Sequence, residues 1–427
     1  MILLYRILAN LIYPFLFIFI YYRKLLKKED SDRYKEKILI SHFKVKKKKK
    51  SKLIWFHAAS IGELKSIIPI IKNLDKTKDN LEFLITTTTL SSGNLAKEEL
   101  KKYENACHRY IPYDVGFLIE KFICSWNPDA IFLVDSEIWP NLILKASQNK
   151  IPLALINARL TSKSFNKWKK FPKTARKIFG LFNLCLSSNL ETKNYLLELN
   201  ARNIYFDGNI KLINKVDENN IITSDADFLK KKRFWIAAST HEGEDLLCLK
   251  VHSELKKKYS DVITIIAPRH IERIKKIQYL FERNNYEVQI LNKNEKIAEN
   301  KEVVLINSYG VLQAYFKHAK SAFIGKSTVK KLKNVGGQNP IDAAKLGCKI
   351  YHGPYVYNFK EIYEILEKNN ISIKINNHET LSDNLIRDLK NPIKEDNKIS
   401  NLINSLGEKI LDDTMKNINN FLFNEIK

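Results

Sequence analysis

The sequence predicts an α/β protein of two Rossmann-like lobes, and three observations lead to this fold class. The chain has 427 residues, which is too long for one compact core and fits two domains of roughly 200 residues each. Strand-like and helix-like segments alternate along it, as in parallel sheets covered by helices. The alternation stops near residue 213 and restarts near residue 229. We therefore expect two sheets, each with helices on both faces, in lobes that face a cleft.

The composition is that of an ordinary globular protein with a basic excess. Apolar residues make up 44% and charged residues 28%, which excludes a wholly disordered, collagen-like or polytopic membrane protein. The net charge of +25 favours polyanionic partners, although a lysine-rich chain can also reflect genome base composition. No zinc-finger or RNP motif occurs, so we expect no nucleic-acid partner. Five isolated cysteines predict neither disulfides nor a thiolate zinc site and indicate a reducing cytoplasm.

Residues 1–22 are almost continuously apolar, broken by Arg6, Asn10 and Pro14 and followed by the basic stretch 23–28. About 20 helical residues can cross a hydrocarbon core of about 30 Å. We expect a membrane anchor, with the basic stretch holding the rest of the chain on the cytoplasmic side. Arg6 and Pro14 weaken a clean span, so a tilted or interfacial helix is the alternative. The run Lys46 to Lys50 is expected to be a solvated loop, or else a second headgroup contact.

The first lobe is expected to cover residues 23–212, where buried strands alternate with helices. The expected strands are 51–58, 81–89, 129–135, 151–157, 184–188 and 203–208. The expected helices are 63–74, 94–102, 139–148, a basic stretch near 162–180, and 191–199. Residues 213–228 are polar and lack apolar periodicity, which predicts a linker.

The second lobe is expected to cover residues 229–427 and to repeat the same pattern. Its expected strands are 234–239, 261–268, 286–291, 302–307, 321–325 and 348–353. Its expected helices are 245–259, 270–284, 310–319 and 340–347. In open parallel sheets, ligands bind beyond the carboxyl ends of the strands. Functional residues are therefore sought where these strands end.

Three strand ends of the first lobe carry ionisable residues. Glu63 follows the first strand at a helix amino terminus, where the helix dipole favours the ionised carboxylate that a general base needs; the alternative is a first-turn glutamate that only stabilises the helix. Asp135 and Glu137 follow the third strand, and either of them could instead cap the next helix. Lys211 follows the last strand, where an ammonium can balance developing negative charge or simply be exposed.

The second lobe carries two candidate anion sites. Arg269 follows the strand 261–268, and its planar fork suits a phosphate or carboxylate. Residues 335–343 read VGGQNPIDA, in which two glycines allow close backbone approach, Asn339 suits a helix cap and Pro340 suits the first helical position. The N–H groups of that helix end predict an anion site, unless the turn has no ligand. No P-loop or GxGxxG motif occurs, and isolated histidines such as His57 lack metal-ligand spacing. We predict no metal site.

Taken in order, several of these motifs resemble those of the 3-deoxy-D-manno-octulosonic acid (Kdo) transferases of lipopolysaccharide assembly. The similar segments, which extend to about residue 365, are HAASIGE, TTTT, YIPYD, DSEIWPNLI, INARLTSKS, GNIKL, ASTHEGE, APRH, GGQNPIDAA and HGPYVYNFKEI. The resemblance implies the GT-B glycosyltransferase fold. It also implies inverting transfer of Kdo from CMP-Kdo to a lipid A precursor (lipid IVA) at the inner membrane, without a metal or other cofactor.

The resemblance also implies roles for individual residues. Glu63 would deprotonate the acceptor hydroxyl, and Asp135 and Lys211 would match positions that stabilise the transition state. The first lobe, 23–212, would bind the acceptor, and the second, 229–427, would bind the nucleotide sugar. The CMP site implied by the motifs would consist of Pro268, Arg269, Tyr309, Gly310, Val311, Asn339, Pro340, Ile341 and Asp342.

This chain departs from the family's pattern at four positions. Val311 stands where a glutamate is frequent, so a polar ribose contact would come from Asp342 or elsewhere. Asp135 replaces the usual glutamate and shortens that side chain by one methylene. Lys326 stands where a glycine is common, and Gln338 where a histidine is common. Two alternatives to Kdo transfer are another GT-B transferase that uses a UDP-sugar and an inactive, membrane-anchored scaffold that binds polyanions.

Overall fold

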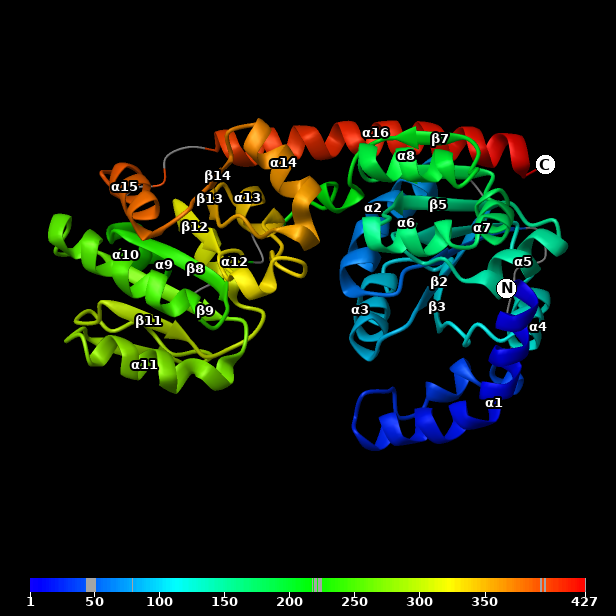
Figure 1. The fold of residues 1–427 in the computed structure, drawn as a ribbon, viewed down its shortest axis with the longest axis horizontal. Helices are drawn as coiled ribbons and strands as arrows, with labels where there is room; N and C mark the ends of the chain where they lie inside the picture. Colours follow the sequence, from blue (N-terminus) through cyan, green and yellow to red (C-terminus); the bar gives the residue numbers. More distant parts are fainter. Residues whose placement is uncertain are drawn as a thin grey trace. The chain divides into compact units, whose positions relative to one another are not determined.

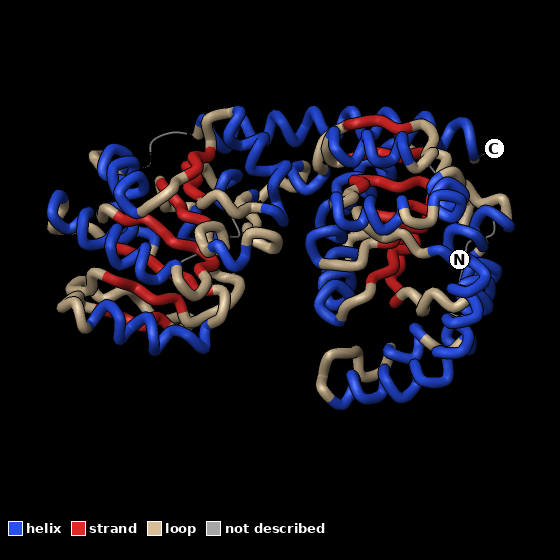
Figure 2. Tube along the Cα trace, viewed as in Figure 1, coloured by secondary structure: helices blue, strands red, loops and turns tan. Residues whose placement is uncertain are grey.

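The computed structural model describes residues 1–43, 51–78, 80–216, 218, 221, 225–391, 394 and 397–426. The predicted loop from Lys46 to Lys50 lies outside these residues. The chain divides into two compact units: unit 1 comprises Met1–Asn214 and Gly407–Lys427, and unit 2 comprises Lys215–Leu406. Within the described residues, each unit holds one seven-stranded parallel sheet flanked by helices (Figures 1 and 2). The prediction of two Rossmann-like lobes is confirmed.

The sheet of unit 1 has the order β3-β2-β1-β4-β5-β6-β7. Its strands are β1 (Lys52–His57), β2 (Leu81–Thr87), β3 (Ala106–Tyr110), β4 (Ala130–Val134), β5 (Leu153–Ala158), β6 (Leu184–Ser187) and β7 (Ile204–Phe206). Strands β1, β4 and β5 are buried along almost their whole length, as expected of a parallel sheet covered on both faces. The strand order reverses between β1 and β4, which makes their carboxyl ends the switch point where α/β proteins bind ligands.

Helices on both faces of this sheet close the core of unit 1. They are α2 (Ile61–Thr77), α3 (Leu90–Leu100), α4 (Gly116–Trp126), α5 (Pro140–Gln148), α6 (Ser162–Lys169), α7 (Pro172–Phe179) and α8 (Leu190–Glu198). Side chains of Ser60, Thr89 and Asn189 cap α2, α3 and α8 by accepting a backbone N–H. These caps fix where each helix leaves a strand end, and so fix the first residues of α2 at the switch point.

The amino-terminal helix α1 (Ile2–Leu25) lies along unit 1 with one stripe facing the domain (Figure 1). Ile2, Ala9, Tyr13 and Leu16 are partly buried and Ile20 is fully buried, at the three- and four-residue spacing of one helix face. The ring of Tyr13 packs edge-on to Phe117 of α4, with centroids 4.8 Å apart. Among the described residues, α1 is the helix long and apolar enough to cross a membrane.

The sheet of unit 2 has the order β10-β11-β9-β8-β12-β13-β14. Its strands are β8 (Phe234–Thr240), β9 (Ile263–Pro268), β10 (Val288–Leu291), β11 (Val303–Ile306), β12 (Ser321–Ile324), β13 (Lys349–His352) and β14 (Ser372–Lys374). Its helices are α9 (Ala226–Lys231), α10 (Glu244–Lys258), α11 (Ile274–Glu282), α12 (Leu312–Phe316), α13 (Ile341–Lys345), α14 (Lys360–Lys368) and α15 (His378–Asp388). Here β8 lies between β9 and β12, so the carboxyl ends of these three strands form the switch point.

The observed boundaries differ from the predicted domains at the last helix. Helix α16 (Lys398–Glu425) belongs to unit 1 from Gly407 onward, whereas residues 229–427 were predicted to form one lobe. Phe421 packs edge-on against Phe132 of β4, with centroids 5.4 Å apart, and the amide of Asn417 donates to both carboxylate oxygens of Asp207. This apolar and polar contact explains why the end of the chain returns to the first sheet. The predicted linker is also shorter than 213–228, since α9 begins at Ala226.

Candidate active site

Two strand ends at the switch point of unit 1 bring its candidate catalytic residues together. Strands β1 and β4 are neighbours, with His57 opposite Leu133. Glu63 lies in the first turn of α2 after β1, and Asp135 directly follows β4. The negative charges of Asp135 and Glu137 both act on the Glu63 carboxyl. The structure therefore gathers these three carboxylates into one acidic cluster.

The carboxylate of Glu63 is oriented by its own helix cap. Its Oε2 accepts the N–H of Ala59 at 2.8 Å, and its Oε1 accepts the hydroxyl of Ser60 at 2.7 Å. Burial raises the pKa of Glu63, and the charges of Asp135 and Glu137 raise it further, against the lowering effect of these hydrogen bonds. A partly buried carboxylate with a raised pKa holds a proton more readily than an ordinary surface glutamate, which suits a general base.

Asp135 pairs with Lys211, which was predicted at a separate strand end. Lys211 Nζ donates to Asp135 Oδ2 at 2.6 Å, with both side chains largely buried. Asp135 has a φ of 62°, a left-handed conformation that a non-glycine residue adopts only when its surroundings fix it. The backbone bonds from Asp135 N to Ile156 O and from Arg159 N to Asp135 O hold it there. The pair places one ammonium group beside the acidic cluster.

Glu137 and His57 form a second pair that the sequence analysis did not assign to the site. His57 ends β1 and is fully buried, its Nδ1 lies 3.0 Å from Thr86 Oγ1, and its Nε2 lies 3.5 Å from Glu137 Oε2. The indole N–H of Trp139 donates to the same Oε2 at 2.6 Å. Burial raises the pKa of Glu137, but His57 and Trp139 lower it by more, so Glu137 stays ionised more readily than an ordinary glutamate. Because Glu137 and His57 lie far apart in the sequence, residue spacing could not predict this pair.

Neither Asp135 nor Glu137 caps helix α5, the alternative role considered for them. Asp114 does so from the loop after β3: its Oδ2 accepts the N–H of Asn141 and its Oδ1 accepts the N–H of Leu142, each at 2.9 Å. Both acidic residues after β4 are therefore available to the cluster. Asp114 lies in the YIPYD segment, but an aspartate 27 residues before Asn141 gives no local capping signal.

In unit 2, the predicted nucleotide residues lie after the ends of several strands. Pro268 ends β9 and is buried, whereas Arg269 beyond it is exposed. The N–H of Arg269 donates to Thr240 O at 3.0 Å, which fixes its backbone to the end of β8. Tyr309 and Gly310 follow β11 and are exposed, and Gly310 has a φ of 82° with no neighbour within 4 Å of a Cβ position. Val311 precedes the short helix α12.

The turn before α13 differs from the predicted helix start. The helix begins at Ile341, one residue later than predicted, and Pro340 precedes it as the cap position. Asn339 still accepts the N–H of Ile341 at 3.0 Å. Asp342 accepts a hydrogen bond from Gln313 of α12 at 3.2 Å, which joins the first turns of α12 and α13. The same helix holds Lys345, which the sequence analysis missed; its ammonium is buried and desolvation lowers its pKa to about 8.

The two glycines of this turn serve the packing of the protein itself. A Cβ at Gly336 would lie 2.3 Å from Tyr355 O, and one at Gly337 would lie 2.9 Å from Val356 Cα, where φ is also +86°. The N–H of Gly337 donates to Lys326 O at 2.7 Å. The predicted close backbone approach at these glycines is therefore made by Tyr355 and Val356 of the chain itself. The N–H groups of Gly337 and Ile341 also have acceptors already.

Glu244 is a structural residue of unit 2 that the sequence analysis did not single out. It is fully buried at the first position of α10. Its carboxylate accepts the N–H groups of His241, Lys326, Ser327 and Thr328 and the hydroxyl of Thr328, at 2.7–3.0 Å. It thus ties the loop after β12 to the end of β8. A buried carboxylate is tolerated because these donors compensate its charge.

Within the part of the chain that the structure describes, no group of three or more His, Cys, Asp and Glu residues could hold a metal ion. The polar groups at the strand ends of unit 1 are instead arranged as carboxylates with one ammonium. This arrangement can accept a proton at Glu63 and stabilise charge beside it.

The two parallel α/β units define the fold class, which is the GT-B fold. Among solved structures, a UDP-N-acetylglucosamine 2-epimerase from Neisseria meningitidis has a TM-score of 0.57 at 15% identity, over 87% of this chain and all of that chain. A second UDP-N-acetylglucosamine 2-epimerase has a TM-score of 0.58 at 13% identity, over 88% of this chain and 96% of that chain. At such identities the likeness shows the fold alone. The predicted GT-B architecture is confirmed.

Sequence relatives identify the family. The family model "3-Deoxy-D-manno-octulosonic-acid transferase (kdotransferase)" matches residues 32–214. A 3-deoxy-D-manno-octulosonic acid transferase of Rickettsia bellii is 30% identical over 98% of this chain and 99% of its own length. A probable mitochondrial 3-deoxy-D-manno-octulosonic acid transferase of Arabidopsis thaliana is 31% identical over 86% of this chain and 83% of its own length. The chain belongs to the Kdo transferase family.

Proposed function

We propose that this chain moves Kdo from CMP-Kdo to the lipid A precursor lipid IVA in lipopolysaccharide assembly, with inversion at the anomeric carbon. Membership of the Kdo transferase family supports the transferred group. The acidic cluster around Glu63 supports the reaction, because it supplies a partly buried carboxylate of raised pKa at the switch point of unit 1. This carboxylate is the observation that carries the mechanism.

In the proposed step, Glu63 takes the proton of an acceptor hydroxyl as its oxygen attacks the anomeric carbon of Kdo. The bond from that carbon to the phosphate oxygen of CMP breaks, and CMP leaves with the bonding electrons. Lys211, held by Asp135, stabilises negative charge in the transition state. The oxygens of Glu63 are oriented by Ala59 N and Ser60 Oγ, so the base is in place before the acceptor binds.

Unit 2 is proposed to bind the donor at the ends of its central strands. The contacts to CMP are assigned to Pro268, Arg269, Tyr309, Gly310, Val311, Asn339, Pro340, Ile341 and Asp342. Arg269 is exposed and its backbone is fixed at the end of β8, so its guanidinium suits the phosphate. Asp342 is held by Gln313 and suits a ribose hydroxyl, in place of the glutamate that Val311 replaces.

No metal is proposed to take part. A CMP leaving group carries one phosphate, whose charge the guanidinium of Arg269 can compensate. Transfer is accordingly expected to continue in excess EDTA, and activity that is lost in EDTA and restored by Mg²⁺ would contradict this proposal.

The site is proposed to act at the cytoplasmic side of the inner membrane. Helix α1 supports membrane attachment, since its exposed face is apolar and the stretch 23–28 that follows is basic. A basic chain of net charge +25 also suits a phosphorylated glycolipid acceptor.

Nucleotide binding tests the assignment of the donor. Calorimetry with the full chain is expected to show CMP binding and much weaker UDP binding. Arg269→Ala is expected to weaken CMP binding by roughly 1.5–3 kcal/mol, the usual value of a charge-assisted hydrogen bond. Equal affinity for both nucleotides, or an unchanged affinity for CMP in Arg269→Ala, would show that the donor site has been placed wrongly.

A further inference from the structure

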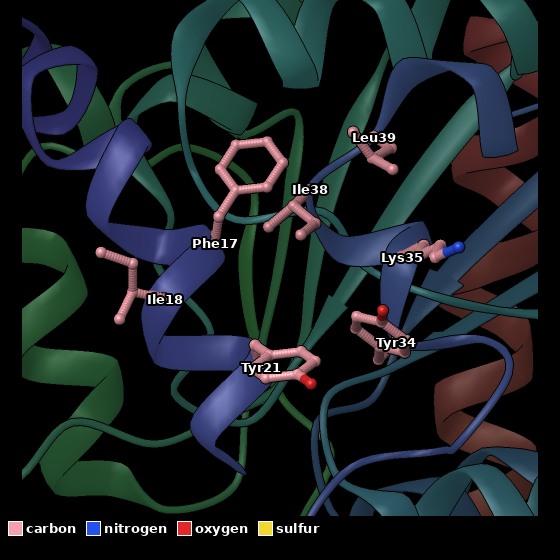
Figure 3. A pocket seen from close by; sticks show the side chains of 7 residues that line it. All are labelled: Phe17, Ile18, Tyr21, Tyr34, Lys35, Ile38 and Leu39. Carbon is pink, nitrogen blue, oxygen red and sulfur yellow. The ribbon is translucent and has the colours of Figure 1, made fainter. Parts of the chain in front are cut away.

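Helix α1 leaves two apolar pockets between itself and the body of unit 1. The first, which we call the Trp139 pocket, is lined by Leu8, Ala9, Ile12 and Leu16 of α1 and by Ile138 and Trp139 after β4. The second, which we call the Tyr34 pocket, lies between Phe17, Ile18 and Tyr21 of α1 and residues 34–39 (Figure 3). Since an α-helix turns by about 100° per residue, Leu8 and Ile12 lie on one flank of α1 and Phe17 and Tyr21 on the opposite flank.

The Trp139 pocket has the size and surface of a ligand site. Its volume is about 570 Å³, within the roughly 300–1,000 Å³ of small-molecule sites. Three titratable side chains line it, namely Tyr5, Tyr113 and Asp114. Two of them are paired, because Tyr5 Oη donates to Asp114 Oδ2 at 2.8 Å. Asp114 also accepts both N–H groups at the start of α5. The remaining lining is aliphatic or aromatic and carries no charged side chain, so the pocket suits a hydrocarbon ligand better than a charged headgroup.

The Trp139 pocket adjoins the acidic cluster. The indole of Trp139 lines the pocket, and its N–H donates to Glu137 Oε2 at 2.6 Å. The charge of Glu137 in turn acts on Glu63. One side chain therefore separates an apolar cavity from the carboxylates at the switch point. The other wall of the cavity is α1, whose outward residues Leu11 and Phe15 are 62% and 66% exposed.

The Tyr34 pocket lacks this connection. Figure 3 shows Phe17 and Tyr21 of α1 facing Tyr34, Ile38 and Leu39, and no strand-end residue contributes to its lining. It also includes Lys35, a cationic side chain. None of the residues that line this pocket contacts the acidic cluster in the way that Trp139 does. An acyl chain bound in the Tyr34 pocket would therefore not be held next to the cluster.

We propose that the Trp139 pocket binds one acyl chain of the glycolipid acceptor. This inference rests on the proposed function and adds a subsite to it. An acyl chain that enters between α1 and Ile138–Trp139 tethers the sugar headgroup beside Glu63, which raises the local concentration of the acceptor hydroxyl. The bulk membrane alone would hold the acceptor near α1 but would not place it at the strand ends.

Matched tryptophan substitutions on α1 test the subsite by activity. Ile12→Trp fills the Trp139 pocket, whereas Ile18→Trp places the same side chain in the Tyr34 pocket. For each variant, kcat/KM is measured with an acylated lipid A precursor in detergent and with its deacylated sugar phosphate. We expect the ratio of the two values to fall at least tenfold in Ile12→Trp and to stay unchanged in Ile18→Trp. An equal fall in both variants, a fall only in Ile18→Trp, or no fall in either would overturn the proposal.

Photocrosslinking tests the subsite without any transfer reaction. The unmodified chain is bound to phosphatidylethanolamine and phosphatidylglycerol vesicles that contain the lipid A precursor with a diazirine on one acyl chain. We expect crosslinks in Leu8, Ile12 and Leu16 of α1 and in residues 138–140, and we expect excess unlabelled precursor to remove them. Crosslinks confined to outward residues such as Leu11 and Phe15, or crosslinks that persist under competition, would show only general contact with lipid and would overturn the subsite. Because this readout needs no product, loss of Kdo transfer would not be mistaken for its failure.

Discussion

Glu63 is the residue whose environment most closely matches its proposed role. Its two oxygens accept hydrogen bonds from Ala59 and Ser60, which favour the ionised form, while burial and two neighbouring carboxylates favour the protonated form. The second group of effects is larger, so the pKa is raised. The helix dipole, from which the sequence analysis expected a carboxylate that ionises easily, is thus outweighed by desolvation and by the charges of Asp135 and Glu137.

The first prediction concerns Glu63→Gln. Loss of a general base costs roughly a hundredfold or more in turnover, while CMP affinity is expected to stay nearly intact. In the unmodified chain, turnover is expected to fall as the pH drops through the raised pKa of Glu63, since only the ionised form accepts the proton. This acidic limb of the pH profile should vanish in Glu63→Gln.

Stability provides the control for this prediction. A carboxyl group with a raised pKa in the folded chain binds its proton more tightly there than in the unfolded chain, so its ionisation costs stability above its ordinary pKa. The neutral amide should therefore leave the melting temperature at pH 7 about unchanged or slightly higher. Full turnover in a folded Glu63→Gln variant would contradict the role assigned to Glu63.

At the scale of single elements, the turn from Gly336 to Ile341 shows how the chain uses its glycines. Gly337 and Gly310 have similar φ angles, +86° and +82°. Only Gly337 has backbone atoms of another segment near its Cβ position, namely those of Val356. The two positions therefore separate the cost of a left-handed conformation from the cost of steric overlap.

The second prediction compares Gly337→Ala with Gly310→Ala in urea unfolding. Gly310→Ala is expected to cost about 1–2 kcal/mol, the usual penalty for a left-handed residue with a Cβ. Gly337→Ala should cost clearly more, because the backbone at Val356 cannot move aside as a flexible side chain can. Gly337→Ala should also weaken CMP binding by displacing Asn339. Equal losses of stability in the two variants would show that the overlap relaxes freely.

Most of the elements could be predicted from their apolar patterns, and the misses have physical causes. Strand β3 contains His108 and Arg109 and so lacks a continuous apolar run. His108 is nevertheless buried, with its Nε2 2.9 Å from Thr87 Oγ1. Helix α16 is amphipathic, but nothing local shows that Phe421 packs on Phe132. Periodicity reports which face is buried, not which sheet buries it.

The candidate site was predictable only to the level of strand ends. The order of strands places Glu63 and Asp135 together once β1 and β4 are neighbours, and that order follows from the whole sheet. The pair of His57 and Glu137 depends on side-chain directions across two strands and could not be read from spacing. The burial of Lys345 depends on tertiary packing and has no local signal in the sequence.

At the scale of the whole molecule, helix α1 is both part of unit 1 and a candidate membrane contact. Its stripe through Tyr13 and Ile20 packs on the domain, and its opposite face is apolar and exposed. Because one face of α1 packs on unit 1 and only the other is free, we expect α1 to lie in the membrane interface, the alternative to a membrane-spanning helix. Deleting residues 1–22 would remove packing from Phe117 as well as membrane contact, so point substitutions separate the two effects better.

The third prediction concerns membrane attachment. The double variant Leu11→Lys with Phe15→Lys charges the exposed face of α1 and should release the folded chain from membranes in high salt. A matched double variant, Leu190→Lys with Leu197→Lys, changes residues of α8 that are 59% and 57% exposed and should stay bound. Sedimentation of washed membranes measures both. Retention of the α1 variant, or equal release of the two, would contradict the proposed role of α1.

The central claim is the transfer of Kdo from CMP-Kdo to an acylated lipid A precursor, and product analysis tests it most directly. The purified full chain is incubated with both substrates. The masses of the lipid products are measured by mass spectrometry, and the released CMP is quantified. We predict a lipid heavier by one or more Kdo residues, one CMP released for each Kdo transferred, and no product with a UDP-sugar. A folded, CMP-binding chain that forms no Kdo-bearing lipid, or that transfers a sugar from a UDP donor instead, would contradict the account.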